Sequence, residues 1–170
     1  MTTAPSGPVR DPAWPLSRTA VGLWVTQGVL GTAVWAAALL VFWLVAPSDA
    51  AAVPVLRWTG LALVLLCGVV TIGVRPQLRY RVHRWEVTGN AVYTLTGWLS
   101  REWTLVPIAR IQTVDVTRGV VQQVFGLASV AVMTASSQGT VRIPHLQVDV
   151  ARRVAEDLTL RAEMVRDEAT

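Results

Sequence analysis

The sequence predicts an α+β protein, in which an N-terminal two-helix transmembrane hairpin precedes an antiparallel β domain with a C-terminal helix. Three observations predict this fold class. Two long apolar runs lie near the start, polar and apolar residues then alternate with a period of two, and the last segment returns to a helical period. We therefore expect a flexible N-terminal arm over residues 1–18, a hairpin over 19–74 and a cytoplasmic domain over 75–170.

The two apolar runs are long enough to cross a bilayer. Thr19 to Ala46 contains no charged residue, and at ~1.5 Å per helical residue it outreaches the roughly 30 Å hydrocarbon core. The second run, Trp58 to Val74, is shorter and spans only with its ends at the interface. A secretory signal peptide is the competing interpretation of the first run, but the apolar part of such a peptide is only about 7–15 residues long.

The charges that flank the two runs predict the orientation. Arg10 and Arg18 precede the first run, and the connecting loop Pro47 to Pro54 holds only Asp49. Four further arginines follow the second run: Arg75, Arg79, Arg81 and Arg84. Because positive residues are retained on the cytoplasmic side, we expect a two-pass protein of the bacterial plasma membrane with both termini in the cytoplasm.

The same four arginines are predicted to contact the membrane surface. Near anionic lipid headgroups each such charge contributes about 1 kcal/mol, so the bilayer itself is an expected partner, although charges that only set the topology would give the same pattern. Arg57 stands apart, because it lies at the start of the second apolar segment. We expect its guanidinium to snorkel to the outer interface, the alternative being a buried functional charge.

A stripe of small residues in the first run predicts helix packing. Gly28, Thr32 and Ala36 recur every four residues, a spacing that lets another helix approach closely, although glycine is common in membrane helices for other reasons. Together with the edge of the first strand after Arg75, this stripe leads us to expect a homo-oligomer or a contact with a membrane-protein partner.

The segment after the hairpin reads as six or seven short strands followed by a helix. A first strand is expected over Tyr80 to Val87 with a bulge near His83-Arg84, and Gly89-Asn90 predicts a two-residue turn with positive φ. The expected core residues come from the strands and from the final helix: Trp85, Tyr93, Leu95, Trp103, Leu105, Val130, Val132, Ile143, Val154 and Leu158.

Three stretches carry a resemblance to a known family. They are Trp98 to Glu102, Val106 to Val114 with its Pro-Ile-Ala-Arg-Ile-Gln core, and Phe125 to Ala128. The chain resembles the bacterial pleckstrin-homology-like membrane-flanked-domain family, of the YdbS type. The resemblance implies a pleckstrin-homology-like domain of two nearly orthogonal sheets closed by a C-terminal helix. Relatives often carry a basic residue before the Phe-Gly pair, whereas this chain has Gln122-Gln123.

The composition offers little for catalysis. The only cysteine, Cys67, lies in the second apolar run, and His83 and His145 are read as structural residues. The net charge of +4 comes from arginines that are not gathered on one predicted helix, so no nucleic acid is expected. We expect no catalytic, cofactor or metal residues, no cofactor and no small-molecule substrate. The predicted function is a non-catalytic interaction or scaffold module, and the alternative is an accessory subunit of a membrane transport or export complex.

Overall fold

The computed structural model describes residues 10–47, 51–97, 99–134 and 139–168, and it divides the chain into two units. The hairpin unit is Arg18–Tyr80, and the β domain combines Met1–Ser17 with Arg81–Thr170. The domain boundary therefore lies later than the sequence suggests, and the N-terminal segment belongs to the β domain.

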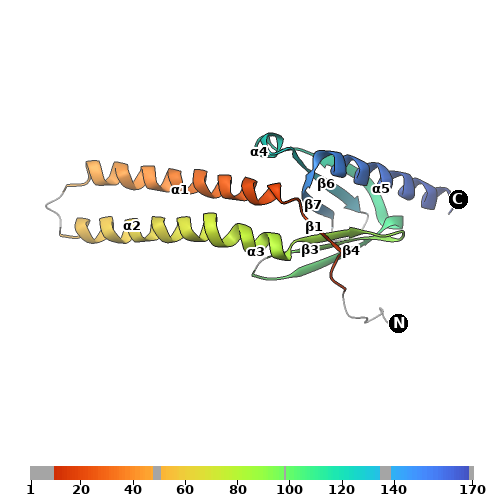
Figure 1. Ribbon diagram of the computed structural model, residues 1–170, viewed down its shortest axis with the longest axis horizontal. Coiled ribbons are helices and arrows are strands. Elements are labelled where there is room, and N and C mark those ends of the chain that lie inside the picture. The colour runs from red at the N-terminus through yellow and green to blue at the C-terminus, as the bar shows by residue number, and fades with distance from the viewer. Residues whose placement is uncertain (1–9, 48–50, 98, 135–138, 169–170) are drawn as a thin grey trace. The chain divides into compact units, whose positions relative to one another are not determined.

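The hairpin unit consists of two antiparallel helical arms that lie side by side (Figure 1). The first arm is α1 (Thr19–Val45). The second is continuous through α2 (Val53–Gly68), the π-helical segment η1 (Val69–Val74) and α3 (Arg75–Val82). Both arms are long and apolar enough to cross a membrane, which confirms the two predicted apolar helices. Asp49 in the connecting loop lies outside the described residues.

The helix of the second arm continues farther than the sequence predicts. Tyr80 and Val82 belong to α3, so the first strand does not begin at Tyr80. Two alternating residues are weak evidence for a strand, and extending an existing helix adds one hydrogen bond for each residue fixed without a new nucleation cost.

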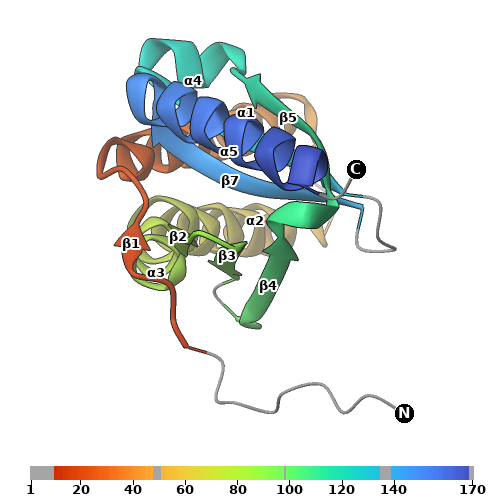
Figure 2. The ribbon, with the colours of Figure 1, turned by 90° about the vertical axis from the view of Figure 1, so that its right-hand side faces the viewer.

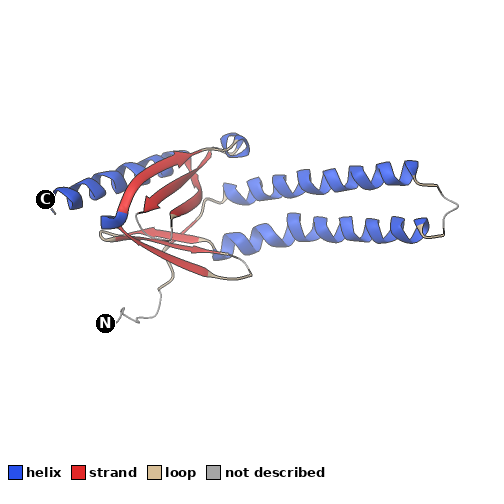
Figure 3. Cartoon of the chain, turned by 180° about the vertical axis from the view of Figure 1, so that it is seen from behind, coloured by secondary structure: helices blue, strands red, loops and turns tan. Residues whose placement is uncertain are grey.

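Two antiparallel sheets form the β domain (Figure 3). The first has the order β1-β2-β3-β4, with β1 (Trp14–Pro15), β2 (Arg84–Val87), β3 (Ala91–Thr96) and β4 (Glu102–Pro107). After the short 3-10 helix η2 (Ile108–Arg110), the second has the order β5-β6-β7, with β5 (Ile111–Thr117), β6 (Leu127–Thr134) and β7 (Thr140–Gln147). The fold is therefore the α+β, pleckstrin-homology-like fold that was expected.

Strand β1 comes from the segment that was interpreted as a flexible arm. Trp14 pairs with Trp85 and Pro15 with Arg84, so the arm interpretation is wrong for this stretch. Proline is compatible with an edge strand, because its missing N–H need not face a neighbour. Residues 1–9 lie outside the described residues.

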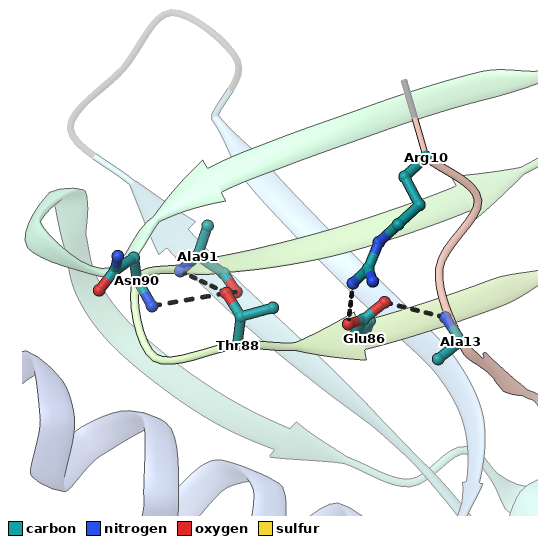
Figure 4. Close-up of polar contacts among 6 residues, drawn as sticks. All are labelled: Arg10, Ala13, Glu86, Thr88, Asn90 and Ala91. Atoms are coloured by element: carbon teal, nitrogen blue, oxygen red, sulfur yellow. Dashed lines mark hydrogen bonds and ion pairs between the residues drawn. The ribbon is translucent and has the colours of Figure 1, made fainter. Parts of the chain in front are cut away.

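The turn between β2 and β3 forms where Gly89-Asn90 predicts it, but by a different mechanism. Neither residue has the positive φ that was expected. Instead, the Thr88 hydroxyl accepts hydrogen bonds from the backbone N–H groups of Asn90 and Ala91, at 3.4 and 3.2 Å (Figure 4). A threonine side chain thus supplies the local bonds that fix the turn.

Two helices complete the β domain. The short α4 (Val120–Val124) connects β5 to β6, and α5 (Val148–Glu168) packs against β5, β6 and η2. Figure 2 shows α5 beside β5 and β7. Leu158, on the inner face of α5, is fully buried. The final helix therefore covers the core, as its apolar period predicts.

The predicted core is correct in its centre and wrong at β4. Leu95, Val130, Val132 and Ile143 are buried together with Leu158. Trp85, Tyr93 and Val154 are only half-buried. Trp103 and Leu105 are exposed, at 41% and 48%, because the opposite face of β4, with Val106, points inward. The register pairs Val106 with the fully buried Val92 of β3.

Candidate functional site

The four arginines predicted to contact the membrane surface fall into two groups. Arg75 and Arg79 are one turn apart on α3, and both line a hollow of about 220 Å³ in the hairpin unit. The Arg79 guanidinium lies 5.5 Å from the centre of the Trp24 ring, within reach of a cation–π contact. Arg81 is exposed on α3, and Arg84 is the first residue of β2. Only the first two arginines are thus brought to one site.

The small-residue stripe packs within the chain. A Cβ on Gly28 would lie 2.8 Å from the Thr71 carbonyl oxygen, so α1 and η1 touch where residue 28 has no side chain. One turn on, the Thr32 and Thr71 hydroxyl oxygens are 3.4 Å apart. Ala36, the third member of the stripe, is exposed. The hairpin's own second arm therefore occupies the surface that was expected to bind another helix.

Arg57, on α2, bonds to the C-terminal end of α1 near the connecting loop. Its Nη2 donates hydrogen bonds to the carbonyl oxygens of Trp43 and Ala46, at 2.9 and 3.0 Å. These carbonyls lie at the C-terminus of α1, where the last four C=O groups lack helical partners and the helix dipole favours a cation. The guanidinium also lies 5.5 Å from the centre of the Trp43 ring. The structure thus gives Arg57 a capping role that the sequence did not reveal.

A polar cluster attaches the N-terminal segment to the first sheet. Glu86 of β2 forms an ion pair with Arg10 and accepts a hydrogen bond from the backbone N–H of Ala13 at 3.0 Å (Figure 4). The Trp103 indole N–H donates to Asp11 at 3.0 Å. The sequence analysis did not predict these contacts. The feature that could have indicated them is the charged pair Arg10-Asp11 and the nearby Trp14, which lie among prolines.

Gln122 organises the segment that joins β5 to β6. Its amide nitrogen donates to the Ser129 hydroxyl at 2.8 Å and lies 3.0 Å from His145 Nδ1. Its amide oxygen accepts from the Gly119 N–H at 2.9 Å, which caps α4. His145 itself has a positive φ of 55°. The glutamine therefore holds a strained β7 residue in place, and this agrees with a structural role for His145.

The β domain also has a polar hollow lined by residues of β3 and β4 from the first sheet and of β7 from the second. It encloses about 490 Å³, and Glu102, Thr104 and Arg142 are among the residues that line it. Strand β4 has a hydrogen-bonded neighbour on one side only, β3, within the described chain. The hollow therefore lies next to the strand at the edge of the first sheet.

The described residues contain no cluster of side chains that would serve as a metal site. No group of three or more His, Cys, Asp or Glu side chains gathers there in a way that would hold a metal ion. Cys67 is a free thiol on the exposed side of α2.

A two-helix membrane hairpin joined to two antiparallel sheets and a C-terminal helix defines a membrane protein with a pleckstrin-homology-like domain. The family model described as Bacterial PH domain matches residues 20–162, and the chain belongs to this family. The UPF0699 transmembrane protein YdbS of Bacillus subtilis (strain 168) is 29% identical over 107 residues, which cover 63% of this chain and 66% of that protein. No solved structure matches the chain significantly. The resemblance seen in the sequence is thereby confirmed.

Proposed function

We propose that the chain is a non-catalytic interaction module, anchored in the plasma membrane with its β domain at the cytoplasmic face. The membership of the Bacterial PH domain family supports a membrane-associated module of this kind. The observation that carries the interaction role is the exposed edge strand β4, which presents Trp103 and Leu105 to solvent.

An edge strand with large apolar side chains is a template for pairing with another strand. The β2 edge, which the sequence suggested for this role, is already covered at Trp85 by β1. Within the described residues no second strand pairs with β4 on its other side. We propose that the partner is a second copy of the chain, which makes the assembly a homo-oligomer.

The mass of the full chain in a mild detergent tests this proposal. Leu105→Arg places a charge on the β4 edge, and we expect it to reduce the assembled mass to that of a monomer. Leu160→Arg is the matched control, because Leu160 is 60% exposed on α5 and lies on no strand. A monomeric wild type, or an assembly that survives Leu105→Arg, would contradict strand pairing.

The alternative function is an accessory subunit of a transport or export complex. It would appear in the same measurement as a complex with other membrane proteins instead of copies of the chain. Such a result would replace the homo-oligomer, and the Leu105→Arg variant would then show whether the β4 edge is the contact.

The proposed orientation rests on the arginines and on β1. The pairing of Trp14, before the hairpin, with Trp85, after it, supports a topology in which both ends of the hairpin lie on one side of the membrane. The arginines favour the cytoplasm for that side. Reporter fusions after Thr170 and within Pro47 to Pro54 should signal from opposite sides, and an external signal from the C-terminal fusion would overturn the orientation.

A further inference from the structure

The hairpin unit carries a groove made of two adjoining hollows. The first encloses about 220 Å³ at the α3 end, and the second encloses about 510 Å³ farther toward the connecting loop. Thr32, Trp35 and Cys67 line both hollows. The two hollows therefore form one continuous groove along the helical arms.

The two ends of this groove differ in chemistry. Arg75 and Arg79 line the first hollow, together with the side chains of Gln27 and Thr71. The second hollow is lined mainly by aliphatic side chains such as Leu39 and by glycine at position 60. A cationic end that donates hydrogen bonds is thus followed by an apolar one.

Gly31 and the π-helical segment η1 both contribute to the first hollow. A Cβ on Gly31 would meet no atom within 4 Å, so open space replaces a side chain in the first hollow. The π-helical turn Val69–Val74 lies where the helix passes from apolar residues to Arg75. Such turns are rare and are frequently found at functional sites.

We propose that this groove binds one anionic phospholipid, with its phosphate at Arg75 and Arg79 and one acyl chain along the apolar hollow. Guanidinium groups bind phosphate through charge-assisted hydrogen bonds, and basic pockets at the ends of membrane helices bind lipid headgroups in this way. Arg75 is the first charged residue after the apolar run that ends at Val74, which is where the headgroup layer begins. The apolar hollow that continues the site distinguishes a lipid from free phosphate.

Lipid binding is tested with the full chain by native mass spectrometry from a mild detergent. Phosphatidylglycerol, phosphatidylcholine and inorganic phosphate are titrated separately. We expect one phosphatidylglycerol to bind at least tenfold more tightly than phosphatidylcholine, because both lipids carry the phosphate but the choline cation places a like charge beside Arg75 and Arg79. Equal binding of both lipids would overturn the proposal, and saturation by inorganic phosphate alone would reduce the site to a simple anion site and also overturn it.

Matched variants locate the site. Arg79→Gln should weaken phosphatidylglycerol binding about tenfold, whereas Arg81→Gln removes the same charge from an exposed position of α3 and should not. Gly31→Leu fills the first hollow without changing any charge and should also remove the bound lipid. If Arg79→Gln and Arg81→Gln behave alike, the lipid responds to net charge and the groove is not its site. Lipid binding in the groove does not require pairing through β4, because Leu105 lines neither hollow. Leu105→Arg should therefore leave lipid binding unchanged.

Discussion

Leu158 offers a direct test of how α5 holds the β domain together. Its side chain is fully buried beneath α5, and its neighbours on the inner face, Ala151 and Ala155, are too small to fill the space that its removal would leave. Complete burial of a leucine contributes about 1.5–3 kcal/mol by transfer, and an unfilled cavity adds to this. We therefore expect Leu158→Ala to lower the free energy of unfolding by about 3–5 kcal/mol.

Amide hydrogen exchange of β6 in the full chain measures this cost, because the slowest core amides report the global unfolding free energy. Leu160→Ala is the control on the same helix, with a side chain that is 60% exposed and an expected effect of less than about 0.5 kcal/mol. If both variants speed the exchange of β6 equally, α5 does not stabilise the core by burying Leu158.

Two further predictions concern the hairpin and the α4 loop. Gly28→Leu should cost the hairpin about 1–3 kcal/mol, because its Cβ would lie 2.8 Å from the Thr71 carbonyl oxygen. Gly31→Leu, which meets no atom at Cβ, should unfold like the wild type in an SDS titration followed by tryptophan fluorescence, and equal losses would refute the close approach. Gln122→Leu should lower the melting temperature of the β domain by removing hydrogen bonds that cost about 1–3 kcal/mol to leave unmade. The exposed neighbour serves as control, since Gln123→Leu should leave the melting temperature unchanged.

The elements that the sequence predicts correctly are those in which many residues follow one repeating pattern. The apolar runs, the strands around Val130 and Ile143, and the final helix each repeat their period several times, and the structure confirms them. The alternation at β4 also predicts a strand correctly. It selects the wrong face, because Trp103 and Leu105 are more apolar than Thr104, and only the register with β3 shows which side is buried.

The features that the sequence does not predict depend on contacts between residues that are far apart in the chain. A two-residue strand such as Trp14–Pro15 has no period to detect, and it exists because β2 offers an edge to it. Arg57 was recognised as unusual, but its bonds to Trp43 and Ala46 require the helices to be placed first. The sequence likewise predicts that Gly28 permits a close approach without identifying which helix approaches.

Strand β1 has a consequence for how the protein is made. Its partner residue Trp85 leaves the ribosome only after the whole hairpin, which at 5–20 residues per second takes roughly 4–14 s after Trp14 has emerged. Over that interval both hairpin arms leave the ribosome, and Trp14 has no β2 strand to pair with. The first sheet is thus completed by strand β1, which is synthesised before the hairpin. A truncation that removes Trp14 and Pro15 would leave the β2 edge uncovered in every newly made copy.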